Sequence, residues 1–292
     1  MPTSPSPTPT IEPSRAARLD RRAVIKATAA FGAMAAAGGV VANRSVAQGS
    51  TTRSGEWRET MATGGSATTF VADHAFTAVA PHWNGDTEFP AAVEISLSED
   101  GERFSDPVVV GPSMADAGPP DRDNRTFGDL VLTPGATHVR YRTLDADGNG
   151  AEIPGLAFTY IDAADGPKLE DVEKPQFYVA ATQPPIISRK EWGAGLAYGG
   201  EDRAWDEWPP RYQTVQHVII HHSETPRFRD PLVEIRSIHY YHAITRCWGD
   251  IGYNYLVDFM GNVYEGRVGG ENAIGGHAFQ YAHGSAGICC MG

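Results

Sequence analysis

The chain has 292 residues, of which 24 are basic and 36 acidic, giving a formal net charge of -12. This length allows roughly two domains with cores of useful size. Nucleic-acid binding requires clustered Lys and Arg that neutralise phosphates, so the acidic balance argues against that class of function.

Residues 1–47 have the features of a twin-arginine export signal. Arg21 and Arg22 precede an Ala/Gly-rich apolar run from Ala27 to Ala42, and Ser45-Val-Ala47 offers small residues for signal peptidase. The alternative is a membrane anchor, but about 16 weakly apolar residues fall short of the roughly 20 that span a bilayer. We therefore expect export, signal cleavage, no stable membrane anchor, and a secreted or cell-wall-associated protein.

After a linker at residues 48–67, residues 68–164 have the period-two pattern of half-buried strands. Val93, Ile95 and Leu97 alternate with polar residues, and Asn-Gly and Asp-Gly pairs punctuate such runs as turns. This pattern predicts a β-sandwich of about seven short strands. The segment contains no catalytic constellation, so we interpret it as an accessory or wall-binding domain.

One loop of this segment has two interpretations. The stretch Asp145-Ala-Asp-Gly-Asn-Gly150 begins like a calcium-binding loop, but its twelfth position is Leu156 instead of a bidentate Glu. A hairpin turn that uses Asp and Gly is the favoured interpretation.

A Pro-rich, charged linker at residues 165–185 leads into a segment, residues 186–292, with an α/β pattern. Asp230 can cap a helix that starts at Pro231 and ends near His242. The expected strands are Val215 to His222, Tyr253 to Phe259, Val263 to Arg267 and Gly287 to Met291. Three cysteines are too few for a disulfide scaffold, and we expect Cys289 and Cys290 to be small core residues.

This last segment carries an ordered set of motifs. Ile187-Ser-Arg-Lys-Glu-Trp-Gly-Ala194 and Val218-Ile-Ile-His-His-Ser223 are followed by the run from Trp248 to Arg267 and by Gly275-Gly-His-Ala278. The set resembles the peptidoglycan recognition protein family, also called type 2 N-acetylmuramoyl-L-alanine amidases, over about Ile187 to Gly292. The resemblance implies a mixed sheet with helices that binds peptidoglycan or its muropeptides.

The resemblance also implies a zinc-dependent hydrolase. Cleaving an unactivated amide requires a strong nucleophile and oxyanion stabilisation, which Zn²⁺ with an open coordination position supplies. His221 and His222 face opposite sides of a strand, and the resemblance selects His221 as the metal ligand. Tyr253 matches the family's catalytic tyrosine. Taken alone, His221 would be a core-edge histidine and Tyr253 a core aromatic.

Four further residues match the family's substrate-binding positions. His242 and His277 match positions that contact the glycan-peptide stem, although either could be a surface histidine. Trp248 and Arg267 match a pocket for meso-diaminopimelate, in which a guanidinium receives the additional carboxylate. Cys247 occupies the position of a family Gly, and we expect it to crowd that pocket.

The expected metal site is incomplete. Domains of this family continue past Met291-Gly292 through a final helix to a His and a Cys that complete the zinc site, and this chain stops before them. We therefore expect weak zinc binding and an exposed apolar sheet face. His277, Asp258 and Cys289 are possible substitutes, although their spacing does not require it.

Two functions stay open. The first is an amidase that hydrolyses the bond between the lactyl group of N-acetylmuramic acid and L-alanine. The second is a non-catalytic peptidoglycan-binding module.

Overall fold

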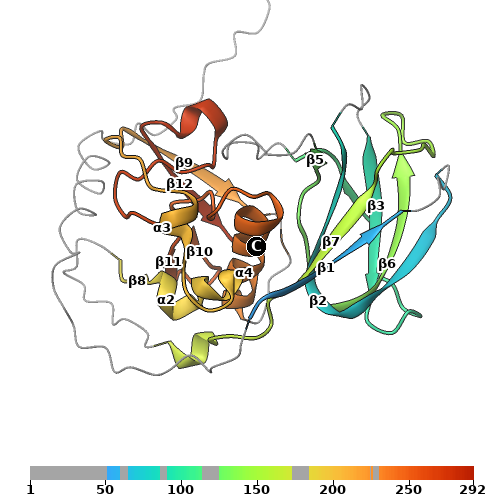
Figure 1. The fold of residues 1–292 in the computed structure, drawn as a ribbon, viewed down its shortest axis with the longest axis horizontal. Helices are drawn as coiled ribbons and strands as arrows, with labels where there is room; N and C mark the ends of the chain where they lie inside the picture. Colours follow the sequence, from blue (N-terminus) through green and yellow to red (C-terminus); the bar gives the residue numbers. More distant parts are fainter. Residues whose placement is uncertain are drawn as a thin grey trace, which may run out of the picture. The chain divides into compact units, whose positions relative to one another are not determined.

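The structure is a computed structural model of the chain, and its described residues all fall within one compact unit. They are residues 51–59, 65–85, 91–113, 125–172, 184–223, 225 and 230–292. The expected export signal lies outside these ranges. Within them, no helix has both the length and the apolar character needed to cross a membrane. Figure 1 shows an all-β module followed by an α/β module.

The all-β module is a seven-stranded sheet with the order β1-β7-β2-β6-β3-β4, and β5 pairs with β2. Every pairing in it is antiparallel. The strands are β1 (Arg53–Arg58), β2 (Thr68–Asn84), β3 (Ala92–Ser98), β4 (Val108–Val110), β5 (Arg125–Phe127), β6 (Val131–Leu144) and β7 (Ala157–Asp162).

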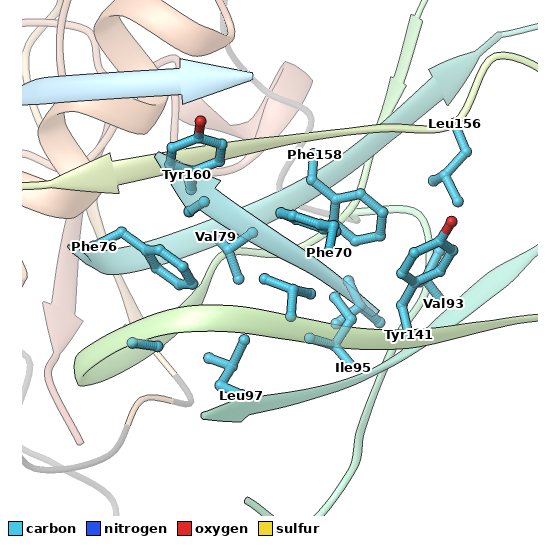
Figure 2. Close-up of a cluster of buried hydrophobic side chains, with 14 of the residues drawn as sticks. Phe70, Phe76, Val79, Val93, Ile95, Leu97, Tyr141, Leu156, Phe158 and Tyr160 are labelled. Atoms are coloured by element: carbon cyan, nitrogen blue, oxygen red, sulfur yellow. The ribbon is translucent and has the colours of Figure 1, made fainter. Parts of the chain in front are cut away.

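The expected β-sandwich would have two separate sheets, whereas strand β2 here pairs with strands on both of its sides. It pairs with β6 from Thr68 to Val79 and with β7 from Ala78 to His82, with register shifts along the first part. Such irregularities bend and twist a strand. The described strands are therefore linked in one sheet around an aromatic core that includes Phe70, Tyr141 and Phe158 (Figure 2). The sequence indicated short strands and did not reveal the 17-residue length of β2.

The expected linker at residues 48–67 contains strand β1, which corrects that boundary. The ring of Trp57 stacks on Phe70 with centroids 4.5 Å apart. The sequence Arg-Ser-Gly-Glu-Trp-Arg has a single large apolar residue, so it lacks the alternation that would have predicted a strand.

The loop after β6 forms a turn, as its favoured interpretation predicted. The Asp145 carboxylate accepts hydrogen bonds from the backbone N–H groups of Asp147 and Asn149, at 2.9 and 2.8 Å. Gly148 adopts a φ of 80°, which favours glycine.

The α/β module has a five-stranded sheet with the order β8-β11-β10-β12-β9. Strands β10 and β11 are antiparallel and the other pairs are parallel, which gives the expected mixed sheet. Its elements are β8 (Ile186–Ile187), α2 (Arg189–Trp192), α3 (Ala204–Glu207), β9 (His217–His222), α4 (Pro231–Tyr240), β10 (Tyr255–Val257), β11 (Val263–Glu265) and β12 (Ser285–Cys290).

Helix α4 begins as the sequence predicts. The Asp230 carboxylate accepts a hydrogen bond from the Leu232 backbone N–H at 3.0 Å, and Pro231 occupies the first turn. The helix continues directly into a π-helical turn, Tyr241–Thr245, which contains His242.

One row of side chains crosses the sheet beneath α4. Ile187, Tyr264, Leu256 and Cys289 are paired across neighbouring strands and buried, and the row ends at the edge strand with His221. Neighbouring strand residues face opposite sides, so Cys290 is exposed and the expectation that both cysteines lie in the core is wrong for it.

The other face of β9 carries exposed apolar side chains. Val218 is 41% and Ile220 63% exposed. Both residues alternate with the half-buried Ile219 and His221.

The two modules are joined through α4, all of whose residues are buried. The Arg236 side chain donates to the carbonyl oxygens of Ala163, Pro167 and Trp192, at 2.9 to 3.2 Å. Ser237 contacts Thr77, with their hydroxyl oxygens 3.2 Å apart. Polar positions that would face water on an isolated amphipathic helix therefore form the contact with the all-β module.

Replacing Arg236 should destabilise the protein. Arg236→Met keeps the length of the side chain but leaves three carbonyl oxygens without their donor, so we expect a loss of about 3 kcal/mol in the free energy of unfolding. Urea denaturation measures the change. Arg103→Met, at an exposed arginine, is the matched control and should change the value by less than about 0.5 kcal/mol. An equal loss of unfolding free energy in both variants would show that the Arg236 hydrogen bonds do not stabilise the protein.

Candidate functional site

Five of the expected site residues form one continuous chain of rings, here called the ring chain. His242 stacks on Trp248 with centroids 4.6 Å apart, and lies 5.7 Å from Tyr253. Tyr253 lies 5.5 Å from His221, whose ring is 5.2 Å from that of His277. The chain joins the π-helical turn, the loop after it, the edge strand β9 and the loop before β12.

The π-helical turn fixes His242 and Trp248 together. The Trp248 backbone N–H donates to the His242 carbonyl at 3.1 Å. The Gly252 backbone N–H donates to His242 Nδ1 at 3.3 Å, which leaves the ring proton on Nε2. Burial lowers the pKa of His242 to about 3, with the positive charge of Arg246 acting in the same direction. This imidazole is therefore neutral at neutral pH.

Tyr253 contributes a protonated hydroxyl. Burial raises its pKa well above the ordinary value, and the neighbouring Cys289 thiol, which is hydrogen-bonded to it, adds to the shift. A phenol that stays protonated can donate a hydrogen bond to a carbonyl oxygen or an oxyanion.

His221 and His277 form a close imidazole pair. His221 Nε2 and His277 Nδ1 are 3.0 Å apart. Burial lowers the pKa of both, that of His277 to about 4, and each also has a neighbouring histidine whose charge lowers it further. A Cβ atom at Gly287 would lie 2.2 Å from the His277 ring, so glycine is required there. The two rings are neutral at neutral pH.

The imidazole pair meets only part of the requirement of a zinc site. Two nitrogens at about 2.0–2.1 Å from a tetrahedral zinc are separated by about 3.3 Å, close to the spacing of the pair. Among the described residues, however, no group of three His, Cys, Asp or Glu side chains could hold a metal ion. Burial raises the pKa of the Cys289 thiol to about 12, and the Asp258 carboxylate accepts from Asn262 and Tyr264.

Arg267 is placed differently from the other expected residues. The residue is 1% exposed, and its guanidinium donates to Asp250 at 2.9 Å and to the Trp208 carbonyl at 2.5 Å and lies over the Trp208 ring. The Arg267 backbone N–H donates to the Tyr253 carbonyl oxygen at 2.7 Å, whereas the partners of its guanidinium within the described part of the chain, Asp250 and Trp208, lie outside the five rings. A ligand carboxylate would have to compete with Asp250 for this group.

Asp250 is the residue that sequence reasoning missed. Its fully buried carboxylate lies 3.0 Å from Arg189, 2.9 Å from Arg267 and 3.4 Å from His239. Burial alone would raise its pKa, but the charges of Arg189 and Arg267, together with the nearby His239 ring, hold it well below the ordinary value. Asp250 lies within the motif that carries Trp248 and Tyr253. An acidic residue between apolar ones was the available signal.

Cys247 was expected to crowd the pocket of Trp248 and Arg267. Its side chain is exposed, and its thiol donates to the Ile244 carbonyl at 3.3 Å. The departure from glycine instead affects the backbone, because Cys247 has a φ of 56° in the left-handed region.

We therefore expect Cys247→Gly to stabilise the protein by about 1 kcal/mol, since glycine adopts this conformation without a Cβ clash. Thermal or urea denaturation measures the change. Cys290→Gly is the control, because it alters an exposed cysteine in the extended strand β12 and should be destabilising. Destabilisation by Cys247→Gly would show that the left-handed backbone is not strained.

Comparison with known proteins gives related sequences for part of the chain. No family model matches. Peptidoglycan-recognition protein SC2 of Drosophila simulans is 33% identical over 110 residues, 37% of this chain and 54% of that protein. Peptidoglycan recognition protein 1 of Bos taurus is 39% identical over 93 residues, 32% of this chain and 45% of that protein. The chain thus spans about half the length of these curated relatives.

A solved structure gives a similar match. Peptidoglycan recognition protein-LE in complex with tracheal cytotoxin, a monomeric diaminopimelic acid-type peptidoglycan, is 34% identical over 37% of this chain and 59% of that chain, with a TM-score of 0.29. Over about a third of its length, this chain is therefore similar in sequence to peptidoglycan-recognition proteins.

Proposed function

We propose that the α/β module binds peptidoglycan fragments at the ring chain. The observation that carries the proposal is that five rings from separate segments meet in one continuous series. Aromatic faces pack against the apolar faces of sugars and peptides, while neutral imidazoles and a protonated phenol can pair with amide and hydroxyl groups. The names of the relatives support the same ligand class.

The favoured ligand is a muropeptide of the meso-diaminopimelate type. One related structure contains such a fragment. The guanidinium of Arg267 matches the position expected to receive the additional carboxylate, but here it is paired with Asp250. Selection for diaminopimelate over lysine therefore requires that Arg267 exchange or share its partner.

Calorimetric titration of the full chain with a diaminopimelate muropeptide tests the proposal. We expect saturable binding that His277→Ala weakens about 10-fold, equivalent to about 1.4 kcal/mol. His283→Ala alters an exposed histidine outside the ring chain and should leave the affinity unchanged. Equal affinities for all three proteins, or no binding by the unaltered chain, would contradict the proposal. A lysine muropeptide measured in parallel reports the selectivity.

The second candidate function is the zinc-dependent amidase. It is favoured by Tyr253, whose ring centroid lies 5.5 Å from that of His221 and whose protonated hydroxyl could stabilise the oxyanion of a cleaved amide. His221, with His277 as its neighbour, would contribute imidazole ligands, and zinc when bound would polarise the amide and activate water. The third protein ligand is not among the described residues. We therefore assign binding to these residues and no hydrolytic step.

Zinc titration and digestion of purified sacculi distinguish the two functions. With two imidazole ligands, we expect weak zinc binding that His221→Ala removes, and no release of free peptide even at saturating zinc. His283→Ala is the control for loss of a histidine elsewhere. Release of peptide that depends on both zinc and Tyr253 would show that this chain completes its metal site, and the amidase would then be the correct function.

Export by the twin-arginine route stays a prediction from residues 1–47. It would place the binding module outside the cytoplasmic membrane, where peptidoglycan lies.

A further inference from the structure

The ring chain is contacted at one end by the all-β module. Arg246 is buried, and its guanidinium carbon lies 4.4 Å from the ring centroid of Trp248 and 5.4 Å from that of Phe127. Phe127 is the last residue of β5 and is itself buried. A single guanidinium group therefore contacts an aromatic ring from each module, a contact that is favourable when the cation is desolvated.

Gly128, the residue after Phe127, contacts the first residue of the π-helical turn. The Tyr241 hydroxyl donates to the Gly128 carbonyl at 2.5 Å, and this hydrogen bond is buried. Tyr241 opens the π-helical turn that contains His242, and the Arg246 backbone N–H closes that turn by donating to the Tyr241 carbonyl at 2.9 Å. Phe127 and Gly128 thus contact the residues on both sides of His242.

The next residues of the all-β module also approach the ring chain. Leu130 is half-buried and packs against the core of the α/β module, as Tyr253 does. The negative charge of Asp129 is a further cause, after burial and Cys289, of the raised pKa of Tyr253. The contact is therefore with the region of the ring chain and not with a remote surface.

Phe127 acts on a turn that needs external support. π-Helical turns are rare, and those that occur are frequently found at functional sites. This turn sets the position of His242, and Trp248 lies three residues beyond its end. Contacts that hold Tyr241 and Arg246 therefore also hold the first two rings of the chain.

We propose that Phe127 of the all-β module is a positioning residue for the muropeptide site, acting through Arg246 on Trp248 and His242. The all-β module is then a structural part of the binding site, which differs from a separate accessory or wall-binding domain. This inference rests on the proposed binding of muropeptides for its functional consequence, whereas the positioning itself can be measured without ligand.

The experiment uses the full chain with Phe127→Leu, Arg246→Met and the double variant. Leu keeps most of the volume of Phe127 but removes the aromatic face, and Met keeps the length of Arg246 but removes the charge. Phe70→Leu makes the same substitution in the core of the all-β module, away from the contact with Arg246. The ¹⁵N-labelled indole N–H signal of Trp248, assigned by its loss in Trp248→Phe, reports the position of the ring.

We expect Phe127→Leu and Arg246→Met each to shift the Trp248 signal and to weaken muropeptide binding about 5-fold. The double variant should be no weaker than the weaker single variant, because both changes remove the same contact. Phe70→Leu should lower the melting temperature without affecting the Trp248 signal or the affinity.

An unshifted Trp248 signal in Phe127→Leu, or an equal shift in Phe70→Leu, would overturn the proposal. So would independent, multiplicative losses of affinity in the double variant. If the unaltered chain binds no muropeptide while Phe127→Leu shifts the Trp248 signal and Phe70→Leu does not, the positioning role stands and the proposed binding function fails.

Discussion

The buried carboxylate of Asp250 is the constraint on which the α/β module depends. A charge without solvent is costly unless opposite charges and donors surround it, and here Arg189, Arg267 and the Val268 backbone N–H do so. The arginines come from α2 and from the residues after β11, so three separate segments meet at one carboxylate. The loop from Trp248 to Tyr253 contains Asp250, and its two rings are thereby held relative to the sheet.

Helix α4 provides the second constraint, because it is buried on all sides. Its apolar residues Leu232 and Ile235 pack in the core of the α/β module, while Arg236 and Ser237 pair with the all-β module. Its end then carries the π-helical turn with His242. The two modules therefore meet on the element that positions the ring chain, which gives the all-β module a structural reason to accompany the α/β module.

The sequence predicted the elements whose signals are local. The apolar run of β9, the Asp230 cap of α4 and the family motif with His221 and Tyr253 identified the framework and most of the ring chain. Strand β1 was missed because its core contact is one residue, Trp57, whose partner Phe70 lies in another strand. The pairing of Arg267 with Asp250 was missed because it depends on tertiary contacts, and a motif identifies an arginine without showing its partner.

We propose that the five rings act as one ligand-binding site, although His242, Trp248 and His277 are buried in the absence of ligand. The most direct measurement is an NMR titration of side-chain ring signals with a diaminopimelate muropeptide. We predict that the signals of His221, His242, His277 and Tyr253 shift together along one saturation curve, while His283 does not respond. Shifts confined to the all-β module, or different saturation curves for rings of the same chain, would contradict the claim.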